Sequence, residues 1–352
     1  MSLIKFKDVK ISGLSAAVPS TKIDNFTFTD LFTAAELENA IKTTGIKERR
    51  FAGDGVCSSD LCFEAAQKLI MDLGVDRSTI DMVIFISQTP DFRQPATAPI
   101  LQDRLGLPKS TACFDINLAC SGYLYGLSTA FSYASQEGVD RVILLVGETL
   151  SKIVSPKDRA TSLLFGDAGT ATLIDKDKNA TPIYMSLNSD GSGEGVLKIA
   201  GGGYRNKSSC ETLAENEFED GSIRSLEHLF MDGMEVFNFT MREVPKDIKK
   251  VLAFAGQDIG DIEYIVFHQA NKFMTDFFAK KLKFPKENIP YSLQKFGNTS
   301  AVSIPLTIVS ELKRLIGSGK KKILLSGFGG GLSWGSAYIE FENVHLSEIV
   351  EL

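Results

Sequence analysis

The chain has 352 residues, of which 43% are hydrophobic and 23% are charged; these are globular values, with room for about two compact domains. No uninterrupted apolar run approaches the ~18 residues that a membrane-spanning helix needs. The 38 basic and 44 acidic side chains leave a net charge of −6, so no excess of cations is available to neutralise nucleic-acid phosphates. Composition therefore rules out a minimal binding module and argues against membrane and nucleic-acid partners.

Cysteine and histidine usage bears on the compartment and on metal chemistry. The five cysteines are an odd and sparse set, which fits a reducing cytoplasm better than a disulfide framework. The three histidines lie far from one another in the sequence and no Cys-x-x-Cys pair occurs, so we expect no metal site. The start of the chain lacks the apolar block and cleavage site of a secretory signal. We therefore predict a cytoplasmic protein without a bound metal.

The predicted strands and helices alternate along the chain, which favours an α/β layered fold. Residues 1–10 alternate apolar side chains with lysine, the period of two of an edge strand. Continuous apolar runs further on predict parallel strands buried on both faces. Such strands are expected at 81–88 and 261–269. Further strands are expected at 141–147, 322–327 and 337–341, and helices at 123–137, from about 272, and at 301–316.

The same strands repeat at one offset. Gln88 and Gln269, which end two of the strands, are 181 residues apart, and Arg141 and Lys322, which begin two others, are also 181 residues apart. A repeat close to half the chain length indicates an internal duplication rather than two unrelated domains. We expect a first half of residues 1–176 and a second half of residues 177–352.

Cys120 is the strongest candidate for a catalytic nucleophile. It lies between an apolar strand and a predicted helix start, where free backbone N–H groups and the helix dipole favour the thiolate. The small Ala119 before it and Gly122 after it leave space for a substrate carbonyl. The alternative is a cysteine that serves only to pack the core.

Two polar residues of the second half complete a candidate site. His268 follows a buried strand, where a histidine is a core or capping group more often than a catalyst, although one presented to a cleft is a useful donor or base. Asn298 lies in an ordinary turn and N-cap sequence, at a place related to that of Cys120. The glycine-rich stretch 327–335 permits close approach of the backbone to a ligand, but Leu332 breaks the dinucleotide-binding pattern.

Together these motifs resemble the ketoacyl-acyl carrier protein synthase III family of the thiolase fold. The resemblance covers nearly the whole chain and rests on six motifs in order: 44–50, 114–120, 158–167, 268–271, 297–305 and 328–336. It implies a duplicated five-layered α-β-α-β-α fold, a homodimer, and a catalytic triad of Cys120, His268 and Asn298. It also implies that neither a metal nor a redox cofactor is needed.

The resemblance implies a decarboxylating Claisen condensation. Cys120 would take an acyl group from an acyl thioester, such as acyl-coenzyme A or an acyl carrier thioester. His268 and Asn298 would stabilise the enolate formed when malonyl-acyl carrier protein loses its carboxylate, and the N–H groups of Cys120 and Gly330 would form the oxyanion hole.

Further roles are implied only by alignment with the family. The expected substrate-binding residues, which line the pantetheine and nucleotide tunnel or flank the reacting thioester, are Arg159, Gly233, Phe237, Ala270, Asn271 and Phe328. Gln94 stands where a partner-subunit phenylalanine commonly closes the acyl pocket. The carrier-docking residues would be Lys272, Lys280 and Lys281, next to Phe273, which replaces an arginine. Asn39 and Thr43 replace the tryptophan and arginine that clasp the adenine of coenzyme A, so we expect weak binding of coenzyme A.

Three functions remain open from the sequence. The leading hypothesis is the condensing enzyme, which either starts fatty-acid synthesis or serves a specialised acyl pathway. The second is a family member that transfers the acyl group from Cys120 to an oxygen or nitrogen nucleophile without decarboxylation. The third is a silent partner subunit of a heterodimeric synthase, whose expected damaged triad is absent.

Overall fold

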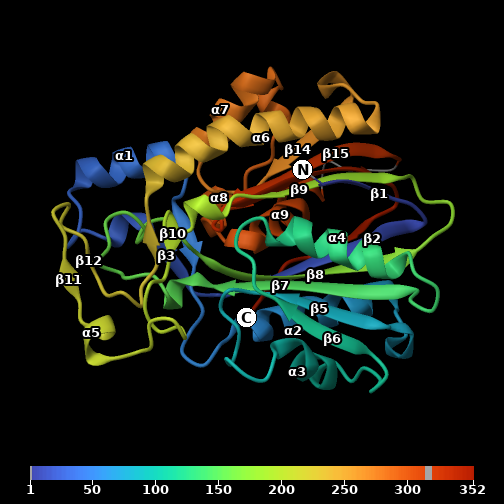
Figure 1. Cartoon of the computed structure of the whole chain (residues 1–352), viewed down its shortest axis with the longest axis horizontal. Helices are drawn as coiled ribbons and strands as arrows, with labels where there is room; N and C mark the ends of the chain where they lie inside the picture. The colour runs from blue at the N-terminus through green and yellow to red at the C-terminus, as the bar shows by residue number, and fades with distance from the viewer. Residues whose placement is uncertain (1, 314–318) are drawn as a thin grey trace.

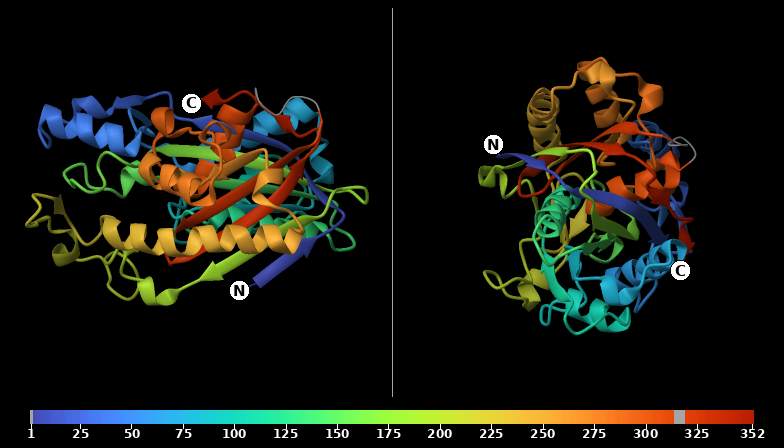
Figure 2. Two further views of the ribbon diagram at one scale, coloured as in Figure 1. Left: turned by 90° about the horizontal axis from the view of Figure 1, so that it is seen from above. Right: turned by 90° about the vertical axis from the view of Figure 1, so that its right-hand side faces the viewer.

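The computed structural model describes residues 2–313 and 319–352, arranged as two β-sheets that alternate with three layers of helices (Figures 1 and 2). The first sheet has the strand order β17-β2-β8-β7-β5-β6, with β18 also paired to β2. Its strands are β2 (Val9–Val18), β5 (Met82–Ile86), β6 (Ala112–Ile116), β7 (Arg141–Thr149), β8 (Asp167–Lys176), β17 (His345–Leu346) and β18 (Val350–Glu351).

The second sheet has the order β1-β9-β16-β15-β14. Its strands are β1 (Ser2–Phe6), β9 (Ile183–Ser189), β14 (Tyr264–Phe267), β15 (Lys321–Gly329) and β16 (Ser333–Phe341). The predicted strands 81–88, 141–147, 261–269, 322–327 and 337–341 correspond to β5, β7, β14, β15 and β16. The edge strand expected over 1–10 is shorter in the structure: β1 lies at the edge of this sheet, as its lysine alternation predicted, but it ends at Phe6, and Val9 begins β2 of the first sheet.

The two sheets repeat one pairing pattern. β5 and β7 pair in parallel, β7 pairs with β8 antiparallel, and β8 pairs with β2 antiparallel. In the second sheet β14, β15, β16 and β9 pair in the same directions and in the same order. The chain ends cross between the halves, because β1 joins the second sheet while β17 and β18 join the first. The predicted division at 176/177 stays a prediction.

Each helical layer buries an apolar face against a sheet. Helices α2 (Ser58–Leu73) and α3 (Thr97–Arg104) cover the outer face of the first sheet, and α6 (Gly233–Ala255) and α7 (Lys272–Leu282) cover that of the second. Helices α4 (Gly122–Ala134) and α9 (Ser303–Thr307) lie between the sheets, as Figure 1 shows. A separate hydrophobic cluster fills each of these three interfaces. The predicted five-layered fold is confirmed.

Two predicted helices differ in detail from the structure. The helix expected over 123–137 begins at Gly122 and ends at Ala134. The stretch expected as one helix over 301–316 consists of a 3-10 turn (Ser300–Val302), α9 and a π-helical turn (Ile308–Leu312); its end at 314–316 lies outside the described residues. The helix expected from about 272 is α7.

Smaller elements surround one end of the layers, on the left of Figure 1. They comprise the helices α1 (Ala34–Thr44), α5 (Cys210–Leu213) and α8 (Leu293–Phe296), and the strands β3 (Lys22–Asp24), β4 (Glu48–Arg50), β10 (Leu197–Lys198), β11 (Asn216–Glu217), β12 (Ile223–Arg224) and β13 (Phe230–Met231). Within residues 2–313 and 319–352, no helix is long and apolar enough to cross a membrane.

Candidate active site

Cys120, His268 and Asn298, predicted as a triad, line one buried cavity of about 70 Å³. They come from both halves of the chain and from three separate elements: the turn before α4, the end of β14 and the turn after α8. Their exposed fractions are 5%, 2% and 6%. The structure therefore brings together the three side chains that were singled out, in a place largely shielded from water.

Cys120 is accommodated by a glycine from the other half. It follows β6 and precedes α4, as the sequence predicted. A Cβ atom at Gly329 would lie 2.7 Å from the Cys120 Cβ and 2.8 Å from its Sγ. The glycine-rich stretch was expected to admit a ligand, and at this position it makes room for the cysteine side chain itself.

The environment of the Cys120 thiol contains opposing effects. Burial raises its pKa to about 11, and the nearby carboxyl group of Glu148 adds to the rise. Hydrogen bonds from the Ser300 side chain and from the backbones of Cys120 and Gly330 lower it. Glu148 is itself fully buried, with a pKa raised to about 8 by burial. Burial thus opposes the preference for the thiolate that the helix start predicted, and three hydrogen bonds counter that burial.

His268 is held as a neutral imidazole. Its backbone N–H donates to the carbonyl of Ser326, and its Nδ1 lies 2.7 Å from the Oγ of Ser303. Burial lowers its pKa to about 3. At neutral pH the ring is therefore uncharged, and the ring of Phe328 meets it edge-on at a centroid distance of 5.4 Å.

Asn298 is fixed by residues of the first half. Its backbone N–H donates to the carbonyl of Leu164 at 2.9 Å, and its own carbonyl accepts from the N–H of Gly166 at 3.0 Å. Its side-chain Oδ1 accepts from the N–H of Ser300 at 2.9 Å. Within the described part of the chain, the Asn298 Nδ2 has no hydrogen-bond partner, so its two N–H bonds remain available to the cavity.

Arg49, for which the sequence predicted no individual role, supports this junction. Its guanidinium is buried, and it donates to the Oδ1 of Asn25 at 2.7 Å and to the carbonyls of Ser162 and Phe165 at 2.6 and 3.2 Å. Gly297, with a φ of 66°, packs against it, since a Cβ atom there would lie 2.8 Å from the Arg49 Cγ. Arg49 thus braces the segment to which Asn298 binds.

A second and larger cavity opens on another side of Cys120. It has a volume of about 400 Å³ and is lined by Cys120, Ser300 and Gly330 together with apolar residues such as Leu150 and Leu229. The exposed Gln88 and Asn117 also line it. Gly330, predicted for the oxyanion hole, therefore borders the same space as the thiol.

The residues expected to bind substrate fall into two groups. Gly233, Ala270, Asn271 and Phe328 line the small cavity. The others lie outside the lining of both cavities: Phe237 stacks on Phe273 at 5.6 Å, Arg159 forms an ion pair with Glu36 at 2.6 Å, and Gln94 is exposed before α3.

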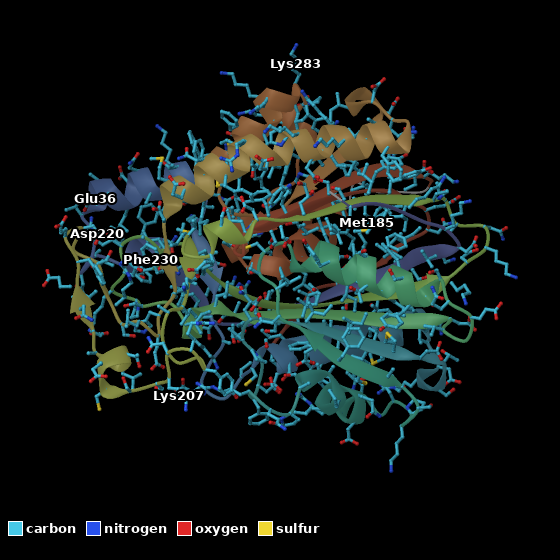
Figure 3. The ribbon with its side chains drawn as sticks, viewed as in Figure 1. Glu36, Met185, Lys207, Asp220, Phe230 and Lys283 are labelled. Carbon is cyan, nitrogen blue, oxygen red and sulfur yellow. The ribbon has the colours of Figure 1, made fainter. Side chains whose placement is uncertain are left out.

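Arg159 is held at the same end of the molecule as the acidic segment 211–220. Its guanidinium packs over the ring of Phe32 at 4.7 Å, and its backbone N–H donates to the Oγ of Ser222, which in turn bonds to Asp220. Figure 3 shows Glu36 and Asp220 at this end of the molecule, on the left. The ion pair with Glu36 leaves less of the guanidinium charge available to a ligand phosphate.

The predicted docking lysines also differ from one another. Lys272 pairs with Asp276 at 2.7 Å, and Lys281 donates to the carbonyl of Met241 at 2.8 Å. Lys280 is exposed and, within the part of the chain that the structure describes, makes no ion pair. Phe273 beside them is 54% exposed, so an apolar ring forms part of this surface.

Comparisons with known proteins identify the family. A model of the C-terminal domain of 3-oxoacyl-[acyl-carrier-protein] synthase III matches residues 252–341, and a second model of that synthase matches residues 114–191. A β-ketoacyl-[acyl-carrier-protein] synthase III from Staphylococcus saprophyticus is 38% identical over 336 residues, which cover 95% of this chain and 99% of the relative.

Solved structures give the same answer. The 3-oxoacyl-(acyl-carrier protein) synthase from Burkholderia xenovorans LB400 matches with a TM-score of 0.93 and 38% identity, over 100% of this chain and 99% of that one. The priming β-ketosynthase of the R1128 polyketide biosynthetic pathway matches with a TM-score of 0.83 and 25% identity, over 96% and 97% of the two chains. The resemblance seen in the sequence is confirmed: the chain belongs to the 3-oxoacyl-[acyl-carrier-protein] synthase III family of enzymes, with the thiolase fold.

Proposed function

We propose that this enzyme joins an acyl thioester primer to malonyl-acyl carrier protein with loss of carbon dioxide, and releases a 3-oxoacyl-acyl carrier protein. One observation carries the proposal: a thiol, a neutral imidazole and a free amide N–H₂ group meet in a single buried cavity. A nucleophile and two uncharged donors are the groups that acyl transfer followed by enolate stabilisation requires.

In the first half-reaction the Cys120 sulfur attacks the primer carbonyl. A carbon–sulfur bond forms to Cys120 as the bond to the donor thiol breaks, and the proton lost by Cys120 leaves on that thiol. Hydrogen bonds from the backbones of Cys120 and Gly330 already reach the sulfur. We assign to these N–H groups the binding of the oxyanion that develops on the primer carbonyl.

In the second half-reaction the malonyl thioester loses its carboxylate. The electron pair of the broken carbon–carbon bond moves into an enolate, whose oxygen accepts from His268 Nε2 and Asn298 Nδ2. The enolate carbon then attacks the carbonyl carbon of the acyl group on Cys120. The bond from that carbon to sulfur breaks, and the Cys120 sulfur leaves as the thiolate. Because burial lowers the His268 pKa to about 3, the ring acts as a neutral donor throughout.

The two cavities divide the substrates between them. The larger one holds the acyl chain, because apolar side chains such as Leu150 and Leu229 line it. The small cavity, bordered by Gly233, Ala270 and Asn271, admits the narrow thioester arm to the triad. Neither half-reaction needs a metal or a redox cofactor.

The partners follow from this reaction. The acyl donor is acyl-coenzyme A or an acyl carrier thioester, and malonyl-acyl carrier protein docks through Lys272, Lys280 and Lys281. A second copy of the chain pairs along β6, which lies at the edge of its sheet within the described residues. The exposed Gln88 and Asn117 of the larger cavity then face this partner, and Gln94 reaches the partner's pocket.

The test is to incubate the protein with a panel of acyl-coenzyme A and acyl carrier thioesters and to weigh the intact chain. We expect one acyl adduct on Cys120, absent from Cys120→Ala, and its conversion to a 3-oxoacyl product when malonyl-acyl carrier protein is added. An adduct without malonyl-dependent product would favour the acyltransferase that moves the group to an oxygen or nitrogen nucleophile. No adduct from any donor would overturn both enzymatic functions and favour the silent partner subunit.

A further inference from the structure

Ser300 contacts all three residues of the triad. Its hydroxyl lies 3.6 Å from the Cys120 sulfur, and its backbone N–H donates to the Asn298 Oδ1 at 2.9 Å. A hydrogen bond between the Ser300 backbone and the His268 ring opposes the lowering of the histidine pKa by burial. Among the site's neighbours, this residue therefore links the nucleophile to both oxygen-binding side chains.

The backbone of Ser300 adopts a sparsely populated conformation. Its φ is 51°, in the left-handed region that non-glycine residues adopt at a cost. The side chain is 2% exposed. Because residues held in this region cluster at active sites, where the surrounding structure maintains the strain, the conformation is consistent with a functional role. It directs the hydroxyl toward the sulfur while the N–H holds the asparagine.

The Ser300 hydroxyl has one partner in the described part of the chain, the Cys120 sulfur. An O–H donor stabilises a thiolate more than a thiol, since the negative charge strengthens the hydrogen bond. In agreement, this contact is the largest effect that lowers the Cys120 pKa against burial. The neighbouring Ser303 differs, because its hydroxyl forms a hydrogen bond with His268 Nδ1 and accepts another from the N–H of Gln269.

We propose that Ser300 is a fourth catalytic residue, whose hydroxyl donates to the Cys120 sulfur and stabilises the attacking thiolate while its N–H orients the Asn298 amide toward the enolate. The proposal rests on the proposed function only in taking Cys120 as the nucleophile. The hydroxyl contributes to acylation, and the backbone contributes to condensation, so a side-chain substitution separates the two.

The test is alkylation of Cys120 by iodoacetamide, which needs no thioester substrate. The thiolate displaces iodide, a carbon–sulfur bond forms, and mass spectrometry of the Cys120 peptide gives the rate. In Ser300→Ala we expect alkylation at pH 8 to slow about tenfold and the midpoint of its pH profile to rise by about one unit. Cys210, which is exposed, serves as an internal control in the same molecule, and iodoacetamide should alkylate it at an unchanged rate.

Two further variants keep the test decisive. Ser300→Gly also removes the hydroxyl, and glycine adopts a positive φ without strain. We therefore expect this variant to fold even if Ser300→Ala does not. Its alkylation of Cys120 should slow by the same factor. Ser310→Ala is the matched control, because the Ser310 hydroxyl is buried without a hydrogen-bond partner in the described part of the chain. It should leave Cys120 alkylation unchanged.

Three results would overturn the proposal: alkylation of Cys120 at the wild-type rate in Ser300→Ala, equal slowing of Cys120 and Cys210, or slowing in Ser300→Ala but not in Ser300→Gly. The last would assign the effect to backbone strain rather than to the hydroxyl. Because no acyl donor is used, an upward shift of the alkylation profile would support the role of Ser300 even if every acyl thioester failed to react.

Discussion

The turn that carries Cys120 and the segment that carries Asn298 hold related places in the two halves but are built differently. Cys120 precedes the regular 13-residue helix α4 and depends on space, which Gly329 provides. Asn298 lies between Gly297 and Ser300, which have φ values of 66° and 51°, and is followed by short 3-10, α and π turns. A nucleophile needs room to attack the primer and to carry the acyl group, whereas an oxygen-binding amide needs a fixed direction, which the strained backbone supplies.

The largest effect should come from removing that amide. In Asn298→Ala we expect condensation to fall ~10²–10³-fold, because one donor to the enolate is lost. Acylation of Cys120 should continue, since the predicted oxyanion hole belongs to Cys120 and Gly330. Single-turnover measurements of adduct formation and of 3-oxoacyl product separate the two. An equally steep fall in acylation would mean that the two regions do not divide the reaction as we describe.

Filling the space beside Cys120 should disrupt the turn that carries the nucleophile. Gly329→Ala places a methyl group within 2.7 Å of the Cys120 Cβ, so one of the two must move. We expect acylation, measured by intact mass, to slow by about 100-fold, as displacements near 1 Å do at reacting atoms. Gly191→Ala is the control, because a Cβ at that position meets nothing within 4 Å. Acylation at the wild-type rate in Gly329→Ala would show that the glycine is not needed for Cys120.

A smaller effect should follow from the loss of the Ser303 hydroxyl. It accepts the Gln269 N–H, so its own hydrogen is available to His268 Nδ1, and the ring proton then lies on Nε2. In Ser303→Ala we expect condensation to fall about tenfold, with alkylation of Cys120 unchanged. Ser303→Thr keeps the hydroxyl and should restore the rate. A fall in alkylation to match condensation would instead indicate a general disturbance of the site.

The smallest effect should be that of pH on the histidine. Burial lowers the pKa of His268 to about 3, below its usual value of about 6.5. The folded enzyme therefore keeps the ring neutral between pH 5 and 8, while the unfolded chain gains a proton as pH falls through about 6.5 and stability declines. Condensation by preformed acyl-enzyme should show no histidine titration in this interval. An inflection near pH 6.5 that Ser303→Ala displaces would contradict the neutral-donor role.

The sequence predicted the layered fold from local patterns, and it predicted the triad from the resemblance to the family. Apolar runs at a constant offset indicated the duplicated strands, and the turn context singled out Cys120. The family motifs then connected it to His268 and Asn298, whose local sequences do not by themselves indicate a catalytic role. The roles proposed for these residues stay predictions until the variants above are measured.

The remaining features depend on contacts between distant parts of the chain. Gly329 and Cys120 are far apart in sequence, so nothing near either one indicates that they touch. The positive φ of Ser300 is set by tertiary structure, since serine has no intrinsic preference for that region. The ion pair of Arg159 with Glu36 and the hydrogen bond of Arg49 to the Ser162 carbonyl likewise join residues that are far apart in the sequence.

The most direct test of the account starts from enzyme acylated on Cys120 and freed of donor. On addition of malonyl-acyl carrier protein, we expect the adduct to disappear as carbon dioxide and 3-oxoacyl-acyl carrier protein form in equal amounts, with one product per acylated Cys120. If the adduct is instead lost without carbon dioxide release, or persists while carbon dioxide forms, then Cys120, His268 and Asn298 do not carry out the condensation that we propose.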